Sequence, residues 1–165
     1  MGEPDHVRAY FKQFFVVYKG LAKWHDELKT EVVRSGLVTT PSGRQFYFPN
    51  VKKFRNGRVS QSTQIVNFPC QSFATATIVP LSCVRALRKF KELDLKSKLI
   101  LTVHDSIVVD CHPSEIDQVK KALVWSMRDI IPEIKERFDY DISIPLDVEM
   151  SVGKNWMEIS EVPLD

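Results

Sequence analysis

The chain has 165 residues, of which 44% are hydrophobic and 27% are charged, and its net charge is +2. A chain of this length builds one sizeable core, and the composition excludes a disordered or fibrous protein. The apolar runs are too short to span a bilayer and the first ten residues lack a secretory pattern, so no membrane contact is predicted. Three cysteines without a motif favour a reducing compartment, and we expect a cytoplasmic location.

The near-neutral total hides a charge asymmetry along the chain. Residues 1–98 carry 17 Lys and Arg against 7 Asp and Glu, whereas residues 99–165 carry 6 against 14. A basic part joined to an acidic part favours a polyanion as the partner of the first and cations as ligands of the second. Two solvated surfaces would give the same pattern, so charge alone leaves this alternative open.

Helical spacing of apolar residues predicts two helices at the start of the chain. The first covers residues 5–18 and carries an aromatic stripe that predicts core packing, and Gly20 interrupts the pattern. The second helix is expected to end near Gly36. Residues 37–48 predict a short hairpin around a Pro-Ser-Gly turn, and residues 49–58 predict a loop.

The middle of the chain predicts a long helical segment followed by a second hairpin. Residues 60–90 have helical composition, but Pro69 and Pro80 are expected to break or kink the helix. Residues 98–103 and 107–111 are β-rich and flank a short polar tip, which is typical of a hairpin.

The last third predicts two helices and a strand. Helices are expected to begin at Pro113 and after Pro132, and residues 146–152 predict a final strand. We therefore predict an α+β fold in which a small antiparallel sheet packs against several helices, with residues 1–165 as a single unit.

The tip of the second hairpin is the first candidate site. Two hydrophobic strands hold Asp105 at a fixed, outward-facing turn, where its carboxylate suits Mg²⁺, a cation that prefers oxygen ligands. Aspartate is also a favoured turn residue, so a purely structural role for His104 and Asp105 stays open.

A basic stretch over residues 44–58 is the second candidate site. Lys and Arg on a loop with aromatic neighbours are typical of a surface that contacts phosphates. A solvated loop whose aromatic residues face the core is the alternative. The basic residues of this stretch are Arg44, Lys52, Lys53, Arg55 and Arg58.

Amide side chains before and after Pro69 form the third candidate site. Asn67 and Gln71 are four residues apart and can project from one helix face. Amides can donate to the purine N3 and pyrimidine O2 atoms that base pairs present in the minor groove, which senses pair geometry without reading sequence. Capping of a broken helix is the alternative.

Five segments, taken in order, resemble the C-terminal part of a family A DNA polymerase of the bacterial DNA polymerase I and phage replicative type. The resemblance extends from about Val7 to Met157. The segments are Tyr18-Lys19-Gly20-Leu21, Gly36-Leu37-Val38-Thr39-Thr40-Pro41-Ser42-Gly43-Arg44, Gln64-Ile65-Val66-Asn67-Phe68-Pro69-Cys70-Gln71, Val103-His104-Asp105-Ser106, and Val148-Glu149 with Gly153-Lys154-Asn155-Trp156.

The resemblance implies a palm subdomain with the base of the fingers, which acts in template-directed nucleotidyl transfer on primer–template DNA with a dNTP as substrate. Asp105 would be a ligand of the catalytic Mg²⁺ ions, and His104 would lie beside the primer terminus. Asn67 and Gln71 match positions that contact the minor groove, and Arg44 with the loop after it would lie against the duplex backbone.

Two departures from the family pattern alter these expectations. The family often has Glu after the His-Asp pair, where this chain has Ser106 beside the metal ligand. Many relatives have Arg four residues before the amide, where this chain has Thr63, so one minor-groove contact is not expected.

Several family elements are not found in the 165 residues: the thumb, the first catalytic motif, the nucleotide-binding fingers helix and the exonuclease. A two-metal site clamps ions about 3.5–4 Å apart, which one aspartate cannot do. We therefore expect the chain to be inactive alone and to need an N-terminal polymerase polypeptide, as in a split phage enzyme of the host cytoplasm or a fragment. The alternatives are a non-catalytic duplex-binding relic and a palm fragment of a single-subunit RNA polymerase.

Overall fold

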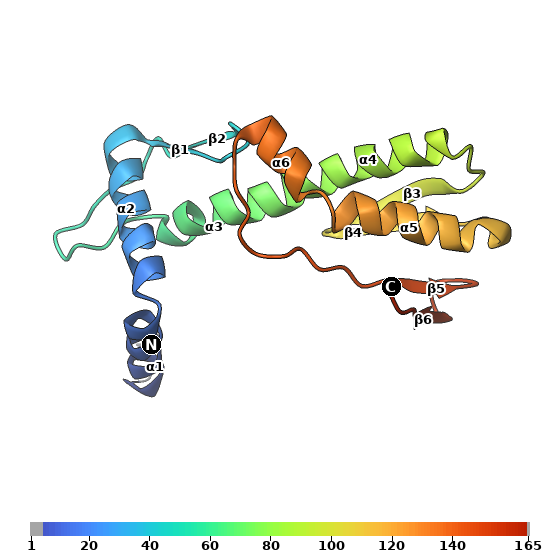
Figure 1. Cartoon of the computed structure of the whole chain (residues 1–165). Helices are drawn as coiled ribbons and strands as arrows, with labels where there is room; N and C mark the ends of the chain where they lie inside the picture. Colours follow the sequence, from blue (N-terminus) through green and yellow to red (C-terminus); the bar gives the residue numbers. More distant parts are fainter. Residues whose placement is uncertain (1–4, 165) are drawn as a thin grey trace. The chain divides into compact units, whose positions relative to one another are not determined.

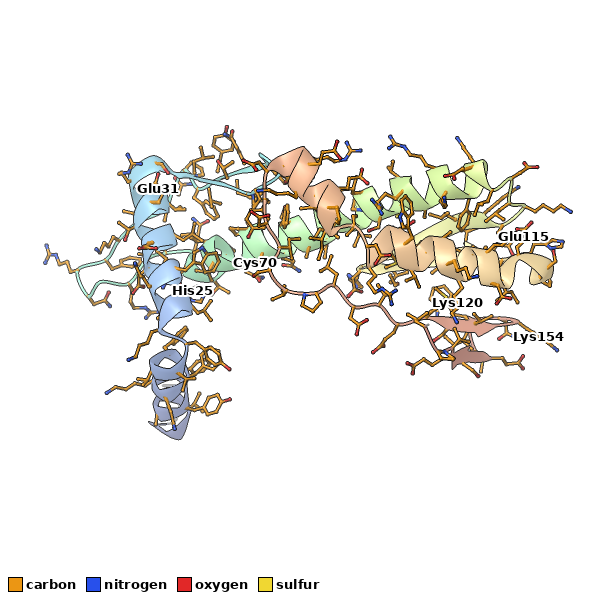
Figure 2. All side chains as sticks on the ribbon, viewed as in Figure 1. His25, Glu31, Cys70, Glu115, Lys120 and Lys154 are labelled. Atoms are coloured by element: carbon orange, nitrogen blue, oxygen red, sulfur yellow. The ribbon has the colours of Figure 1, made fainter. Side chains whose placement is uncertain are left out.

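The computed structural model describes residues 5–164 and contains helices and antiparallel hairpins, which confirms the predicted α+β class (Figure 1). The chain divides into two compact units, one up to Cys70 and one from Gln71 onward. The boundary falls within one helix, α3 (Ser62–Phe73), on which Cys70 lies (Figure 2). The assignment of the chain to one palm unit with the base of the fingers stays a prediction, and each unit is described by itself below.

The first unit begins with the two predicted helices, α1 (Asp5–Val17) and α2 (Lys19–Ser35). Gly36 ends α2 with a φ of 69° and donates its N–H to the carbonyl of Val32 at 2.8 Å. Glycine is favoured in this left-handed conformation because it has no Cβ to clash with the backbone. β1 (Leu37–Thr39) then pairs antiparallel with β2 (Gln45–Tyr47), which confirms the predicted hairpin.

A small core joins these elements to α3. It consists of Val32, Val38, Phe48 and Ile65, all of them buried. The ring of Phe68 lies next to Phe48 at a centroid distance of 6.1 Å, so α3 turns one face toward the β1–β2 hairpin. This packing fixes the start of α3 and leaves its other face exposed.

Of the predicted break or kink at Pro69, the break is wrong, because α3 runs through Pro69 as far as Phe73. The irregularity lies later, in a π-helical turn over Ala74–Ile78, after which α4 (Val79–Glu92) begins. The Val79 N–H donates to the Ala74 carbonyl, five residues back, directly before Pro80. A proline has no N–H and its ring crowds the carbonyl four residues earlier, so a widened turn accommodates Pro80 without ending the helix.

The second unit contains the second predicted hairpin and two further helices. β3 (Lys98–Val103) pairs antiparallel with β4 (Ser106–Asp110), with a register shift at Ile100. The 3₁₀ turn Pro113–Glu115 leads into α5 (Ile116–Met127), and α6 (Ile131–Phe138) follows. Both predicted helices are present, but α5 begins three residues after Pro113 and α6 begins one residue before Pro132.

Two apolar clusters hold the second unit together. In the first, Phe90 of α4 and Leu123 of α5 pack with the hairpin residues Leu99, Ile107 and Val109. The second centres on the buried residues Phe73, Ile130 and Ile134. The first cluster therefore fastens one face of the β3–β4 hairpin to α4 and α5, which lie beside it in Figure 1.

The end of the chain differs from the predicted strand over residues 146–152. The regular structure is β5 (Ser151–Gly153), which pairs antiparallel with β6 (Ile159–Glu161). Among the described residues the strands form three separate two-stranded sheets instead of one small sheet. Within the same residues, no helix has the length and apolar character needed to cross a membrane.

Candidate functional site

The turn between β3 and β4 presents His104 and Asp105 to solvent. Val103 and Ser106 are paired across the hairpin, so the loop contains only these two residues. His104 has a φ of 53°, a left-handed conformation that side chains other than glycine seldom adopt. A tight two-residue hairpin turn calls for such a positive φ, and in this turn the side chain of Asp105 is exposed.

Ser106 stabilises this turn from its C-terminal side. Its hydroxyl donates to the carbonyl of Val103 at 2.8 Å, which links the two strand ends across the loop. A serine at this position therefore closes the turn. The residue that departs from the family pattern thus has a structural contact within the hairpin.

The base of the hairpin is held by Glu115, which sequence reasoning missed (Figure 2). Its carboxylate accepts hydrogen bonds from the Ser97 hydroxyl at 2.6 Å, from the Ser97 N–H at 2.9 Å and from the Lys96 N–H at 3.0 Å. These donors, the Ser97 hydroxyl first among them, lower the pKa of Glu115 to about 2. Glu115 is therefore an anion that ties the start of α5 to the start of β3.

A buried ion pair fixes the opposite end of α5. Arg85 on α4 donates to Glu133 at 2.6 Å and to the carbonyls of Trp125 and Asp129 at 2.9 and 3.0 Å. Burial raises the pKa of Glu133, but hydrogen bonds from Arg85 and Arg137 outweigh it and hold that pKa below its ordinary value. An arginine and a glutamate 48 residues apart gave no local signal in the sequence.

The basic stretch of the first unit is an ordered loop. The Lys52 N–H donates to the Ser60 hydroxyl and the Ser60 N–H to the Lys52 carbonyl, both at 2.8 Å. The Phe54 N–H donates to the Arg58 carbonyl at 2.8 Å, and Gly57 completes the turn with a φ of 81°. Among the described residues, no carboxylate pairs with the following exposed cations of the loop: Lys52, Lys53, Arg55 and Arg58.

The sequence left open whether the aromatic neighbours of this loop face the core or a ligand, and the structure shows both arrangements. Phe46 and Phe48 pack against Phe68 with ring centroids 5.3 and 6.1 Å apart, so they belong to the core side. Tyr47 and Phe54 are 72% and 52% exposed and therefore remain available to a ligand.

The two amide residues both lie on α3 and both are exposed. Because the helix is continuous at Pro69, Asn67 and Gln71 share one side of it and no broken helix end is present there to be capped. Asn67 belongs to the first unit, whereas Gln71, His104 and Asp105 belong to the second. Of the candidate site residues, the structure thus places His104 and Asp105 side by side in one turn. The others are placed within their own units.

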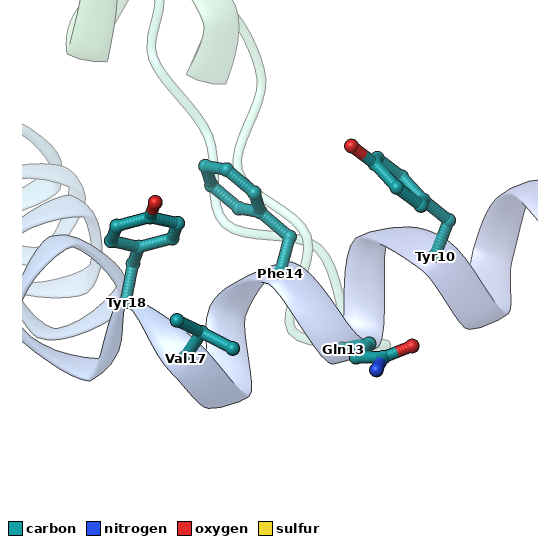
Figure 3. A pocket seen from close by; sticks show the side chains of 5 residues that line it. All are labelled: Tyr10, Gln13, Phe14, Val17 and Tyr18. Carbon is teal, nitrogen blue, oxygen red and sulfur yellow. The ribbon is translucent and has the colours of Figure 1, made fainter.

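The aromatic stripe of α1 is more exposed than its predicted core packing requires. Tyr10 and Tyr18 are 69% and 54% exposed. Figure 3 shows the rings of Tyr10, Phe14 and Tyr18 on one side of the helix, where with Gln13 and Val17 they line a hollow of about 340 Å³. Within the described residues of the first unit, no element buries this side.

The described residues offer a metal ion only part of a site. Among the described residues, no group of three or more His, Cys, Asp or Glu side chains could hold one. An exposed carboxylate on a rigid turn still suits Mg²⁺, which keeps several waters and takes one or two carboxylates from a protein. Asp105 thus fits the role of one ligand in a larger site.

Comparison with known proteins gives consistent matches. The family model described as DNA polymerase family A matches residues 3–158. DNA polymerase I of Lactococcus lactis is 29% identical over 154 residues, which are 92% of this chain and 16% of that protein. The DNA polymerase of Bacillus phage SP01 is 25% identical over 162 residues, which are 98% of this chain and 17% of that protein. The chain thus spans about one sixth of the length of these curated relatives.

A solved structure shares the fold. It is the POL domain of Pol1 from M. smegmatis in complex with DNA primer-template and dNTP. The TM-score is 0.71 at 20% sequence identity, and the match covers 87% of this chain and 24% of that one.

Proposed function

The chain belongs to DNA polymerase family A, and from this membership we propose that it forms the C-terminal catalytic part of a DNA-directed DNA polymerase. The observation that carries the proposal is the position of Asp105 at the tip of a two-residue turn, on a hairpin fastened to its own helices. The family match is to DNA polymerases, so we retain this activity over that of a single-subunit RNA polymerase.

In this proposal Asp105 is one ligand of the catalytic Mg²⁺ ions and His104 lies beside the primer terminus. The bound ions would stabilise charge on the attacking and leaving oxygens of nucleotidyl transfer. A second carboxylate must come from polymerase sequence outside residues 1–165, in the same polypeptide or in a partner polypeptide. Residues 1–165 alone are then inactive, and a split phage polymerase acting in the host cytoplasm is one form of this proposal.

The remaining candidate residues would contact primer–template DNA. Asn67 and Gln71 would donate to minor-groove acceptors near the new base pair, and the continuous α3 helix supports their shared orientation. Arg44 and the cations of the loop over residues 52–58 would contact the duplex backbone. The order of that loop supports this role, because a fixed loop loses less entropy when it binds phosphates.

The catalytic proposal is tested in a chimera in which residues 3–158 replace the matching segment of the Lactococcus lactis polymerase. We expect Mg²⁺-dependent primer extension that Asp105→Asn lowers by about a thousandfold, because loss of a metal ligand removes several kcal/mol of transition-state stabilisation. The matched control is Asp110→Asn, an exposed carboxylate at the other end of β4, which should leave the rate within about threefold. Equal extension by the Asp105→Asn and unsubstituted chimeras would refute the role of Asp105.

DNA binding is tested separately with the full chain and a short primer–template duplex. Each phosphate neutralised changes the slope of log K against log salt by about −0.9, so Arg55→Ala with Arg58→Ala should reduce its steepness by about 2. Lys12→Ala with Lys23→Ala, on helices outside the loop, should leave the slope unchanged. Binding that depends on the loop, together with an inert Asp105→Asn chimera substitution, would favour a non-catalytic duplex-binding module instead.

A further inference from the structure

A second hollow lies in the second unit. It lies where the chain passes from α4 into β3, a connection that Figure 1 shows. Its volume is about 410 Å³, and its lining comes entirely from residues 87–99. Leu87, Phe90, Leu95 and Leu99 supply an apolar floor. Phe90 is buried in the core below, whereas Leu87 is 45% exposed, so the floor is continuous with the core yet open to solvent.

The rim of this hollow is basic. Lys91 and Lys98 line it, and Lys96 is an exposed residue of the same connection. Within the described part of the chain, no carboxylate forms an ion pair with any of the three lysines. Asp94 is the acidic residue of the lining, and Asp110 stands opposite Lys98 in the strand register without forming an ion pair with it.

We propose that this lysine-rimmed hollow binds an acidic peptide segment of a protein partner that inserts an apolar side chain between the lysines. Charge complementarity selects the acidic flanks, because unpaired lysines attract carboxylates and steer their approach. The apolar floor selects the anchor, because binding becomes more favourable when a leucine- or phenylalanine-sized group displaces water from an apolar hollow.

Duplex DNA fits this hollow less well than a peptide does. A duplex backbone presents phosphates to the lysines but has no apolar side chain to fill a concave floor of leucines. The residues proposed to contact DNA, on the loop of the first unit, on α3 and at the turn between β3 and β4, do not line this hollow. The lysine-rimmed hollow therefore adds a protein partner to the proposed polymerase.

The test uses the full chain and the fluorescein-labelled peptide Asp-Asp-Leu-Phe-Asp-Asp, with binding followed by fluorescence anisotropy at low and moderate salt. We expect saturable binding that weakens as salt rises. Lys91→Glu combined with Lys98→Glu should weaken it by at least about tenfold, and Leu87→Ser should do so by about tenfold, as expected for loss of one buried apolar contact. Asp94→Asn should strengthen binding about threefold, because it removes the acidic residue of the rim.

Matched controls separate this site from general stickiness. Lys121→Glu reverses an exposed charge on α5 and should change the affinity by less than about twofold. The peptides Lys-Lys-Leu-Phe-Lys-Lys and Asp-Asp-Ser-Ser-Asp-Asp should not bind, since each keeps only one of the two recognition features. Circular dichroism of every variant verifies its fold.

Three results would overturn the proposal. The first is no binding of the acidic peptide at millimolar concentration, and the second is an unchanged affinity in Leu87→Ser. The third is that a short DNA duplex displaces the peptide and that the combined Lys91→Glu and Lys98→Glu variant no longer binds this duplex. That result would make the hollow a nucleic-acid surface.

Discussion

Replacing Arg85 by methionine tests whether the buried ion pair positions the helices that support the hairpin. The guanidinium of Arg85 is within 2.6–3.0 Å of one carboxylate oxygen and two backbone carbonyls, and it lies 3.9 Å from the Trp125 ring centroid. The Arg85→Met substitution keeps the apolar stem and removes every one of these polar contacts. Glu133 keeps Arg137 as a partner, whereas the carbonyls of Trp125 and Asp129 lose their donor.

The expected loss follows from these contacts. Hydrogen bonds of a charged group contribute about 1.5–3 kcal/mol each, and breaking a buried ion pair typically costs about 3–5 kcal/mol. Among the described residues the Nε atom of Arg85 has no partner, so methionine also removes the cost of burying that atom. We therefore expect the free energy of unfolding to fall by about 3 kcal/mol, at the lower end of this range.

The assay is urea unfolding of the full chain at neutral pH, followed by circular dichroism. The matched control is Arg128→Met, because Arg128 and Asp129 form an exposed pair at 3.5 Å whose loss should cost less than about 0.5 kcal/mol. Arg85→Lys should give an intermediate loss, since a lysine keeps the charge but not the forked donors. The reasoning would be refuted by an Arg85→Met variant that unfolds at the same urea concentration as Arg128→Met.

Two further predictions concern the hairpins. Since the pKa of Glu115 is about 2 in the folded chain and about 4.5 in the unfolded chain, its contribution to stability is complete above pH 4.5 and is lost as pH falls toward 2. Glu115→Gln should therefore flatten the dependence of the urea midpoint on pH between 2 and 5. An unaltered dependence would contradict this. Gly153→Ala places a Cβ in steric clash with the Glu158 carbonyl oxygen and should open the β5–β6 hairpin, seen as a shift in tryptophan emission. Ser160→Ala on the same hairpin should leave the spectrum unchanged.

The sequence predicted the elements whose signals are local. Gly36 marked the end of a helix because only a few residue types accept its conformation, and the β-rich runs around His104 and Asp105 marked a hairpin with a fixed tip. These predictions held because each depends on residues within one or two turns of one another. The helix did not break at Pro69, because α3 is packed both before that position, at Ile65, and after it, at Phe73.

The supports of the candidate site could not be predicted, because they join residues that are distant in sequence. Glu115 contacts Ser97, 18 residues away, and Arg85 contacts Glu133, 48 residues away. A charged residue in such a pattern looks like any solvated surface residue until the fold brings its partner close. The signal that did exist for Glu115 was an acidic residue in the first turn of a proline-initiated helix, which favours the turn but names no partner.

The positions of the cations in the structure change how the charge asymmetry of the sequence is interpreted. A balance of basic residues over the first 98 positions suggested one surface for a polyanion, but Arg34 pairs with Glu31 and Lys89 with Glu92, and Arg85 is buried. Among the described residues, cations without an ion-pair partner include those of the loop over residues 52–58 and those that line the lysine-rimmed hollow. Because the first group lies on an ordered loop and the second borders an apolar hollow, the same charge would serve two ligands of different shape. A count of charges along a chain therefore predicts that anions bind, whereas the shape beneath each group of cations decides which anion.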